Sequence, residues 1–374
     1  MRVVLLHDVR EDLNLSMKLY AERIATAIGQ GCEVSHFYPW CAGSSRVPLG
    51  RGIKLLDYLA RYAIYPASVL ACHGDVFHVI DHAYGHLLAC IPSRHSVVTC
   101  HDLMLLKLQR GELRSASRMP PVPVWLWRAS VAFLRRAARI VSDSTATADD
   151  LLRHLGIDHA RVRVIHPGVD PRFGPLREPG ARQKARERLG IDGAPLLLHV
   201  GNNWFYKNLE GLLRAFARLR ASGAGRGALL LKVGKPLSPT QRALAASLGI
   251  EKNVREVGLL NHHDLQAAYW AADALVFPSR WEGFGWPPLE AMASGTPVIA
   301  SARGALAEVV GDAAEIVDPD DPQNIANAIE RVLTDTGLRE DLIAHGLERA
   351  CLFTWERAGR ELLDVYREVL DEAG

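Results

Sequence analysis

Short runs of apolar residues alternate with amphipathic stretches along nearly the whole chain. Residues 2–6 (RVVLL) are typical of a buried strand, and residues 17–28 carry apolar side chains three and four positions apart, which is typical of a helix. Further strands are predicted at 76–80, 96–99, 140–142 and 162–165. Because strands that alternate with helices form parallel sheets covered on both faces, the pattern predicts an α/β fold.

The same alternation starts again in the second half of the chain. A strand is predicted at 195–200 and a helix at 209–219. The strands that follow are expected at 228–233, 254–257, 274–277, 297–300 and 314–317. Two series of this kind predict two Rossmann-like domains with parallel sheets that face one another across a cleft.

Composition marks the boundary between the two series. Residues 166–179 (HPGVDPRFGPLREP) contain four prolines and two glycines, which neither a helix nor a central strand tolerates. We therefore predict an N-terminal domain over 1–168, a linker over 169–180 and a C-terminal domain over 181–354. The amphipathic segment 355–374 is expected to form a last helix that packs back on the N-terminal domain.

Composition also excludes several classes of protein. The chain has 374 residues, of which 48% are hydrophobic and 23% charged, so disorder and a small disulfide scaffold are excluded. The net charge of +2 gives no case for nucleic-acid binding, although residues 1–170 carry 20 basic against 15 acidic side chains. The six cysteines show no CxxC pair, the N-terminus has no signal-peptide core, and no apolar run could span a bilayer. We therefore expect a cytoplasmic protein with free thiols.

Two common nucleotide-binding fingerprints are absent. The first strand is followed by HDVREDLNLS, which contains no G-x-G-x-x-G, and Gly234-Lys235 lacks the remaining residues of a P-loop. An NAD-dependent oxidoreductase and a P-loop ATPase are therefore disfavoured.

Residues 277–300 (FPSRWEGFGWPPLEAMASGTPVIA) carry the most informative pattern in the chain. Gly283 and Gly285 allow backbone N–H groups to approach a ligand closely, and the N-terminus of the following helix favours an anionic group. Glu282 on the loop and Glu290, expected in the first turn of that helix, can accept hydrogen bonds from separate hydroxyls of one ligand. Taken singly, Glu290 could instead complement the helix dipole, and Glu282 could be a solvated loop charge.

This segment resembles the signature of the family-four glycosyltransferases, which are retaining nucleotide-sugar enzymes of the GT-B fold. Their Glu-x7-Glu motif, E-G-F-G-x-P-x-L-E-A-M-A-x-G-x-P-V, is matched from Glu282 to Val298. Val200-Gly201 with Lys207-Asn208 is similar to the phosphate-binding element of the family. The match is thinner in the first domain.

The resemblance implies a role for several residues. Glu282 would contact the donor sugar and Glu290 the ribose. Lys207 would neutralise the pyrophosphate, and His101, which on its own pattern could be a core histidine, would reach across the cleft as a catalytic residue. The other donor-binding candidates are Asn202, Asn203, Gly283, Phe284 and Gly285. The family usually needs no metal, so we expect no cofactor besides the nucleotide diphosphate sugar as co-substrate.

The sequence departs from the family pattern at the phosphate-binding loops. Many members place an arginine soon after the Val-Gly pair, where this chain has two asparagines, and Arg280 or Arg303 is a candidate substitute. The glycine pair usually found after the first strand is also missing. The acceptor-side candidates are Asp12, Asn14, Asp81 and His82.

Two further patterns have competing interpretations. His78, His82 and His86 are spaced by four, but residues 76–80 are predicted as strand, so a metal site that needs one helical face is disfavoured. Residues 107–139 mix basic side chains with tryptophan, phenylalanine and leucine. They form either an ordinary helix face with snorkelling arginines or a surface that attaches to an anionic membrane.

We therefore expect a cytoplasmic enzyme, with peripheral attachment to the inner face of the membrane as an alternative. It would transfer a hexose, with retention, from a nucleotide diphosphate sugar to an acceptor hydroxyl. Residues 78–103 and the Lys-Asn variant resemble bacterial polysaccharide and lipopolysaccharide mannosyl- or glucosyltransferases, so GDP-mannose is the leading donor and a saccharide or lipid-linked saccharide the acceptor. The alternatives are a nucleotide-sugar epimerase of the same fold and a non-catalytic glycan- or nucleotide-binding protein.

Overall fold

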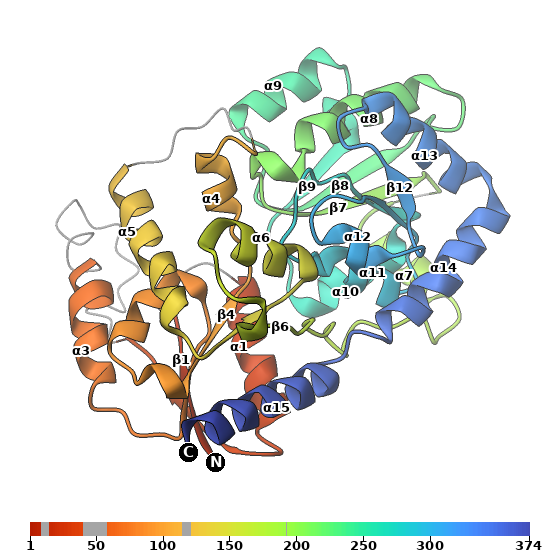
Figure 1. Ribbon diagram of the computed structural model, residues 1–374. Coiled ribbons are helices and arrows are strands. Elements are labelled where there is room, and N and C mark those ends of the chain that lie inside the picture. Colours follow the sequence, from red (N-terminus) through yellow and green to blue (C-terminus); the bar gives the residue numbers. More distant parts are fainter. Residues whose placement is uncertain (9–14, 40–57, 114–120, 192) are drawn as a thin grey trace. The chain divides into compact units, whose positions relative to one another are not determined.

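The chain divides into two compact units, unit 1 (residues 1–168 and 355–374) and unit 2 (residues 169–354). The computed structural model describes residues 1–8, 15–39, 58–113, 121–191 and 193–374. Each unit holds one six-stranded sheet whose strand pairs are all parallel. The predicted α/β fold class is confirmed (Figure 1).

The sheet of unit 1 has the strand order β2-β1-β3-β4-β5-β6. Its strands are β1 (Arg2–Leu6), β2 (Glu33–Phe37), β3 (Val76–Val79), β4 (Ser96–Cys100), β5 (Arg139–Ser142) and β6 (Val162–Val164). Strands β3, β4 and β5 are buried at every position, as a parallel sheet covered on both faces requires. Strand β2 was not predicted, because its sequence EVSHF lies at the edge of the sheet and carries no continuous apolar run.

The helices of unit 1 include the C-terminal one. They are α1 (Leu15–Ile28), α3 (Tyr65–Val69), α4 (Met104–Gln109), α5 (Pro121–Ala132), α6 (Thr145–Leu155) and α15 (Trp355–Ala373). Helix α15 packs on α1 so closely that a Cβ at Gly359 would collide with Ala27. It is also tied to β3 by a 2.6 Å hydrogen bond between the Tyr366 hydroxyl and His78 Nδ1. The C-terminal helix is therefore part of the core of unit 1.

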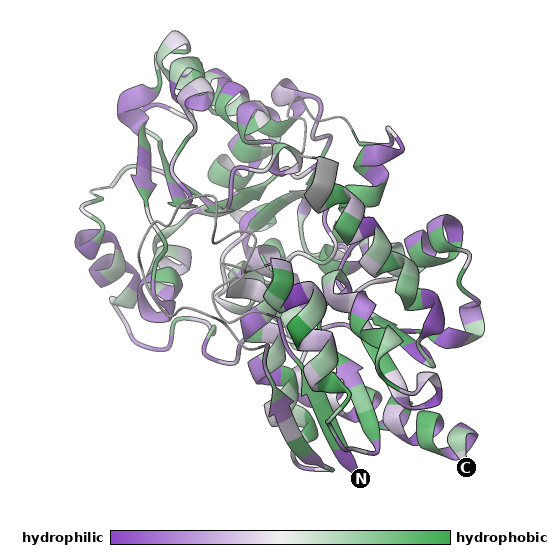
Figure 2. Ribbon diagram, turned by 90° about the vertical axis from the view of Figure 1, so that its left-hand side faces the viewer, coloured by the Kyte–Doolittle hydropathy of each residue, from purple (hydrophilic) through white to green (hydrophobic). Residues whose placement is uncertain are grey.

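The sheet of unit 2 has the order β12-β11-β10-β7-β8-β9. Its strands are β7 (Leu196–Gly201), β8 (Leu229–Gly234), β9 (Val254–Val257), β10 (Ala274–Phe277), β11 (Val298–Ser301) and β12 (Glu315–Val317). Its helices are α7 (Ala181–Arg188), α8 (Leu209–Ala221), α9 (Pro239–Ser247), α10 (His262–Ala271), α11 (Trp286–Ala293), α12 (Leu306–Val310), α13 (Pro322–Thr334) and α14 (Thr336–Ala350). For unit 1, Figure 2 shows hydrophobic colour along the strands beside the N-terminus and mixed colours along the helices. This is expected where amphipathic helices cover buried strands.

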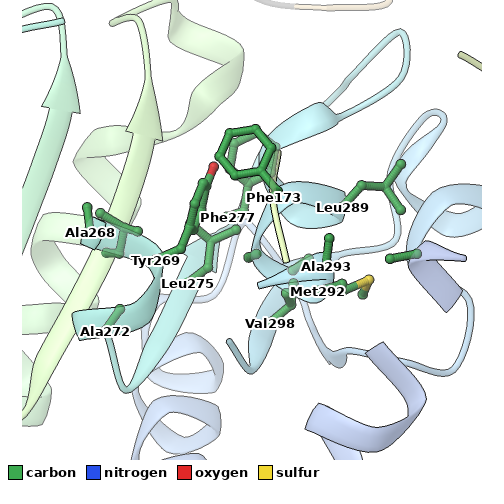
Figure 3. Close-up of a cluster of buried hydrophobic side chains, with 14 of the residues drawn as sticks. Phe173, Ala268, Tyr269, Ala272, Leu275, Phe277, Leu289, Met292, Ala293 and Val298 are labelled. Carbon is green, nitrogen blue, oxygen red and sulfur yellow. The ribbon is translucent and has the colours of Figure 1, made fainter. Parts of the chain in front are cut away.

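Residues 169–180, which the sequence analysis assigned to a linker, belong to unit 2. Phe173 lies in the hydrophobic core, where its ring meets the edge of Tyr269 at 5.6 Å between centroids (Figure 3). The Gly174 carbonyl accepts a 2.8 Å hydrogen bond from Trp270 Nε1. The prolines and glycines correctly indicated irregular backbone. They could not indicate that this backbone is packed, because its partners lie about 90 residues further along the chain.

The basic segment 107–139 is divided among α4, α5, a 3₁₀ turn and the start of β5, with residues 114–120 outside the described part. Two of its cations are used inside unit 1: Lys107 Nζ lies 2.7 Å from the Asp150 carboxylate, and Arg139 pairs with two glutamates of α15. Trp125 is 67% exposed. The basic side chains of the described residues that remain exposed are Arg110, Arg128, Arg135 and Arg136. The basic surface is thus smaller than the sequence suggested.

Candidate functional site

The sharp turn between β7 and α8 positions Lys207. The turn passes through Asn202–Trp204 and a 3₁₀ turn (Phe205–Lys207) and reaches Asn208, whose backbone is left-handed with φ of 56°. Asparagine tolerates this conformation better than most residues. The buried Asn208 amide donates hydrogen bonds to the carbonyls of Pro278 (3.1 Å) and Pro319 (2.6 Å), which follow β10 and β12. The turn is therefore fastened to the carboxyl ends of two other strands, where ligands bind in open α/β sheets.

Lys207 and Glu282 form a buried ion pair at this edge of the sheet. Lys207 Nζ lies 2.8 Å from Oε1 and 2.9 Å from Oε2 of Glu282, and the two residues are 9% and 6% exposed. Oε1 is close to the ammonium but accepts no hydrogen bond of acceptable geometry from any described residue. A buried carboxylate oxygen with free hydrogen-bonding capacity favours a donor such as a ligand hydroxyl.

The loop after Glu282 leads directly into α11. Gly285 has φ of 117°, and a Cβ there would collide with Leu306. Phe284 is buried against Phe353. Helix α11 begins at Trp286, so Glu290 is its fifth residue, and the prediction that Glu290 lies in the first turn was wrong. The tandem prolines indicated a helix start correctly, but the helix begins one residue before them.

Glu290 is held by Tyr269 of α10. The Tyr269 hydroxyl donates a 2.6 Å hydrogen bond to Oε2 of Glu290. Burial raises the pKa of Glu290 to about 7, although this hydrogen bond acts in the opposite direction. The carboxyl group therefore changes charge near neutral pH, and its charged form is the better hydrogen-bond acceptor.

Asn202 and Asn203 shape the loop between β7 and Lys207. Asn202 Oδ1 accepts a 3.1 Å hydrogen bond from the Trp204 backbone, and the Asn203 amide donates to the Pro236 carbonyl. Asn203 Oδ1 is buried and accepts no hydrogen bond from the described residues. The two arginines considered as substitutes for the missing arginine are both paired with aspartates, Arg280 with Asp320 at 2.8 Å and Arg303 with Asp318 at 3.6 Å.

His101 follows β4 in unit 1, and both of its ring nitrogens are engaged there. Nδ1 lies 2.6 Å from the Asp143 carboxylate and Nε2 lies 2.9 Å from the Ile80 carbonyl. Burial is the largest single effect and would lower the pKa of His101, but the charge and hydrogen bond of Asp143, the charge of Asp81 and the Ile80 carbonyl together raise it to about 9. In this arrangement His101 is a charged residue that links the ends of β3, β4 and β5. Its role toward a donor stays a prediction.

Of the acceptor-side candidates, Asp12 and Asn14 lie outside the described residues. Asp81 caps the 3₁₀ turn His82–Ala89 by accepting a 2.8 Å hydrogen bond from the Ala83 backbone. His82 Nδ1 lies 3.3 Å from the Asp81 carboxylate. Within residues 1–8, 15–39, 58–113, 121–191 and 193–374, no group of three His, Cys, Asp or Glu side chains could hold a metal ion.

Unit 2 also contains a buried cation that the sequence pattern did not indicate as part of a site. Lys232 lies in β8 and is 1% exposed. Its ammonium reaches the carbonyl of Gly201, the last residue of β7, at 2.6 Å. The available signal was a lysine inside an otherwise apolar strand (LLLKVG).

Comparison with known proteins identifies relatives along most of the chain. A family model described as "Glycosyltransferase Family 4" matches residues 22–173, and one described as "Glycosyl transferases group 1" matches residues 181–349. A D-inositol 3-phosphate glycosyltransferase of Salinispora arenicola is 35% identical over 82% of this chain and 72% of the relative. The protein of the same name from a Nocardioides species is 34% identical over 96% and 84%.

Solved structures show the same fold at lower identity. The sucrose-phosphate synthase of Thermosynechococcus elongatus has a TM-score of 0.79 at 23% identity, with both chains covered completely. Anabaena HepE, solved with UDP and glucose, has a TM-score of 0.76 at 19% identity and covers 98% of this chain and 100% of its own. This similarity confirms the GT-B fold. No helix in the described part of the chain is long and apolar enough to cross a membrane. Together, the two family models and the relatives of more than 30% identity show that the chain belongs to the family-four glycosyltransferases.

Proposed function

We propose that this glycosyltransferase transfers a hexose from a nucleotide diphosphate sugar to an acceptor hydroxyl, with retention and without a metal or other cofactor. The observation that carries the proposal is the buried pair of Lys207 and Glu282, 2.8 Å apart at the carboxyl edge of the unit 2 sheet. It offers an ammonium group to phosphate and a carboxylate to sugar hydroxyls at one point.

The reaction exchanges one bond at the anomeric carbon for another. The bond from that carbon to the phosphate oxygen breaks, and the acceptor oxygen bonds to the carbon on the same face. The departing phosphate oxygen takes the acceptor proton, so charges and atoms balance. Lys207 stabilises the negative charge that grows on the pyrophosphate, and the backbone N–H groups of Gly283 and Gly285 with the start of α11 support the same charge. Glu282 orients the hexose, and Glu290 accepts hydrogen bonds from the ribose.

The donor and acceptor are assigned from likeness to other proteins. The resemblance to polysaccharide and lipopolysaccharide enzymes favours GDP-mannose and a saccharide or lipid-linked acceptor. The curated relatives at 34–35% identity are named for D-inositol 3-phosphate, which makes this phosphorylated cyclitol the second candidate acceptor.

Transfer in the presence of EDTA tests the proposal. We expect GDP-mannose or another nucleotide sugar to raise the melting temperature, since a ligand at 100 times its Kd stabilises by about 2.7 kcal/mol. With a saccharide or D-inositol 3-phosphate as acceptor, the product should keep the anomeric configuration of the donor, and EDTA should not change the rate. Turnover of the donor without any acceptor would support an epimerase, and binding without turnover would support a non-catalytic protein. Loss of activity in EDTA that magnesium restores would contradict metal independence.

We also propose that unit 1 binds an anionic membrane surface. Four arginines line a hollow of about 430 Å³, and none of them pairs with a carboxylate in the described part of the chain: Arg94, Arg135, Arg136 and Arg161. Arg94, Arg135 and Arg161 donate hydrogen bonds to backbone carbonyls, but no carboxylate neutralises their charge. Guanidinium groups in this state attract the negative surface of anionic lipids.

Vesicle co-sedimentation tests the membrane proposal. We expect binding to vesicles that contain anionic lipid, weaker at high salt and weaker after Arg135→Ala with Arg136→Ala. The matched control is Arg214→Ala with Arg218→Ala, two exposed arginines of α8 in unit 2. Equal sedimentation with neutral and anionic vesicles would contradict the proposal.

A further inference from the structure

Lys232 is the most deeply buried ammonium group among the described residues of unit 2. It lies in β8 opposite His199 of β7, and it is 1% exposed. Its Nζ donates three hydrogen bonds, to the carbonyls of Gly201 (2.6 Å), Val233 (3.0 Å) and Lys235 (3.1 Å). All three ammonium protons are therefore used, and all three acceptors are backbone groups at the carboxyl ends of β7 and β8.

No carboxylate of the described residues lies within ion-pair distance of Lys232. A buried charge without a counter-ion is costly, and three neutral carbonyls offset only part of that cost. The nearby cations add to the same positive field. Lys207 repels Lys232 as a like charge. The Glu282 carboxylate contacts Lys207 but not Lys232, so it neutralises only the first of the two. The carboxyl edge of β7 and β8 thus carries two buried ammonium groups, of which only Lys207 contacts a carboxylate, while Glu256 acts on Lys232 from beyond ion-pair distance. This edge lies next to the N-terminus of α8.

The ends of the two strands beside Lys232 are glycine backbone. Gly201 and Gly234 are register partners at the last positions of β7 and β8, and both have positive φ, 154° and 107°. A Cβ at Gly234 would collide with the Gly201 carbonyl oxygen, the same atom that Lys232 binds. A strand end made of glycine backbone allows a phosphate to approach closely.

We propose that Lys232 is a positioning residue for the phosphates of the donor. Its hydrogen bond fixes the Gly201 carbonyl, from which the loop to Lys207 starts, and its charge lies beneath that loop, where it attracts phosphates without contacting them. The proposal rests on the proposed function, because it assumes a nucleotide diphosphate at this edge.

The environment of Lys232 makes its charge sensitive to pH. Burial lowers its pKa to about 8; Glu256 of β9 opposes this effect and Lys207 adds to it. His199, the remaining titratable neighbour, has its pKa lowered to about 3 by burial and by Lys232, so it stays neutral. The folded pKa lies below the unfolded value, so Lys232 loses its charge as the pH rises through about 8. Binding of a diphosphate should weaken over the same interval.

Binding of UDP and GDP by Lys232→Met at two pH values tests the proposal. For wild type we expect weaker binding at pH of about 9 than at about 7.5, where the phosphates keep nearly constant charge. Lys232→Met should bind about tenfold more weakly at the lower pH, the scale of one partly screened charge interaction, and should lose the pH dependence. The matched control is Lys252→Met, which removes an exposed lysine just before β9, at the opposite edge of the same sheet, and should behave as wild type.

The outcomes separate this proposal from the proposed function. If wild type binds neither nucleotide, the donor assignment fails and this inference fails with it. If wild type binds and a folded Lys232→Met binds equally well with the same pH dependence, only the inference is overturned. Should Lys232→Met unfold, Lys232→Gln keeps a donor for the Gly201 carbonyl without the charge, and it must show the same loss of affinity and of pH dependence.

Discussion

Replacing Lys207 by methionine is expected to lower turnover by about 10²–10³-fold, the usual cost of removing one group that stabilises transition-state charge. Methionine keeps most of the length of the side chain and removes its charge. Charge on the pyrophosphate grows as the glycosidic bond breaks, so turnover should fall more than donor affinity. Steady-state kinetics with the donor found in the nucleotide-sugar screen measures both quantities.

The ion pair complicates this variant in a predictable way. Lys207→Met leaves the Glu282 carboxylate buried and unpaired, and breaking a buried pair at one partner costs about 3–5 kcal/mol. The double variant Lys207→Met with Glu282→Gln removes both charges, so it should regain much of the melting temperature but none of the turnover. Near-normal turnover in a folded Lys207→Met would refute the assignment of this residue to the phosphates.

Replacing Glu290 by glutamine is expected to raise the donor KM by about tenfold or more, because hydrogen bonds to a charged acceptor are stronger than those to an amide. The effect should depend on pH. The pKa of Glu290 is raised to about 7, so wild type should bind the donor better as the pH rises through 7, whereas Glu290→Gln should show no such change. A pH profile of donor KM from about 5.5 to 8 checks this.

The same group gives a stability readout that is independent of catalysis. The folded pKa of Glu290 lies above its unfolded value, so its protonated form stabilises the fold at low pH, and this contribution is lost as the pH rises to about 7. Glu290→Gln should lack that part of the pH dependence. Tyr269→Phe removes the hydrogen bond that favours the charged form, so it should move the midpoint upward. If the free energy of unfolding depended on pH in the same way in wild type and in Glu290→Gln, the raised pKa of Glu290 and the expected effect of Tyr269→Phe would both be contradicted.

The amino-acid pattern alone determined the architecture and the identity of most candidate site residues. Parallel strands buried on both faces are continuous apolar runs, so their positions could be predicted from the sequence. The Glu-x7-Glu motif placed Glu282 on a loop and Glu290 on the helix that follows it. The exceptions have physical reasons. Strand β2 is a half-polar edge strand without such a run, and the proline-rich segment 169–180 is packed through partners distant in sequence.

Only the tertiary structure decided which atoms meet. Lys207 and Glu282 are 75 positions apart, and no local pattern indicates that they neutralise each other. Likewise, the sequence placed His101 after a strand, but the fold engages both of its ring nitrogens within unit 1. In the sequence, Lys232 is an unexplained lysine in an apolar strand. The fold places the Gly201 carbonyl of β7 within hydrogen-bond distance of its ammonium group. Periodicity records which face of an element is buried, whereas partners and pKa values depend on contacts that exist only after distant segments have packed together.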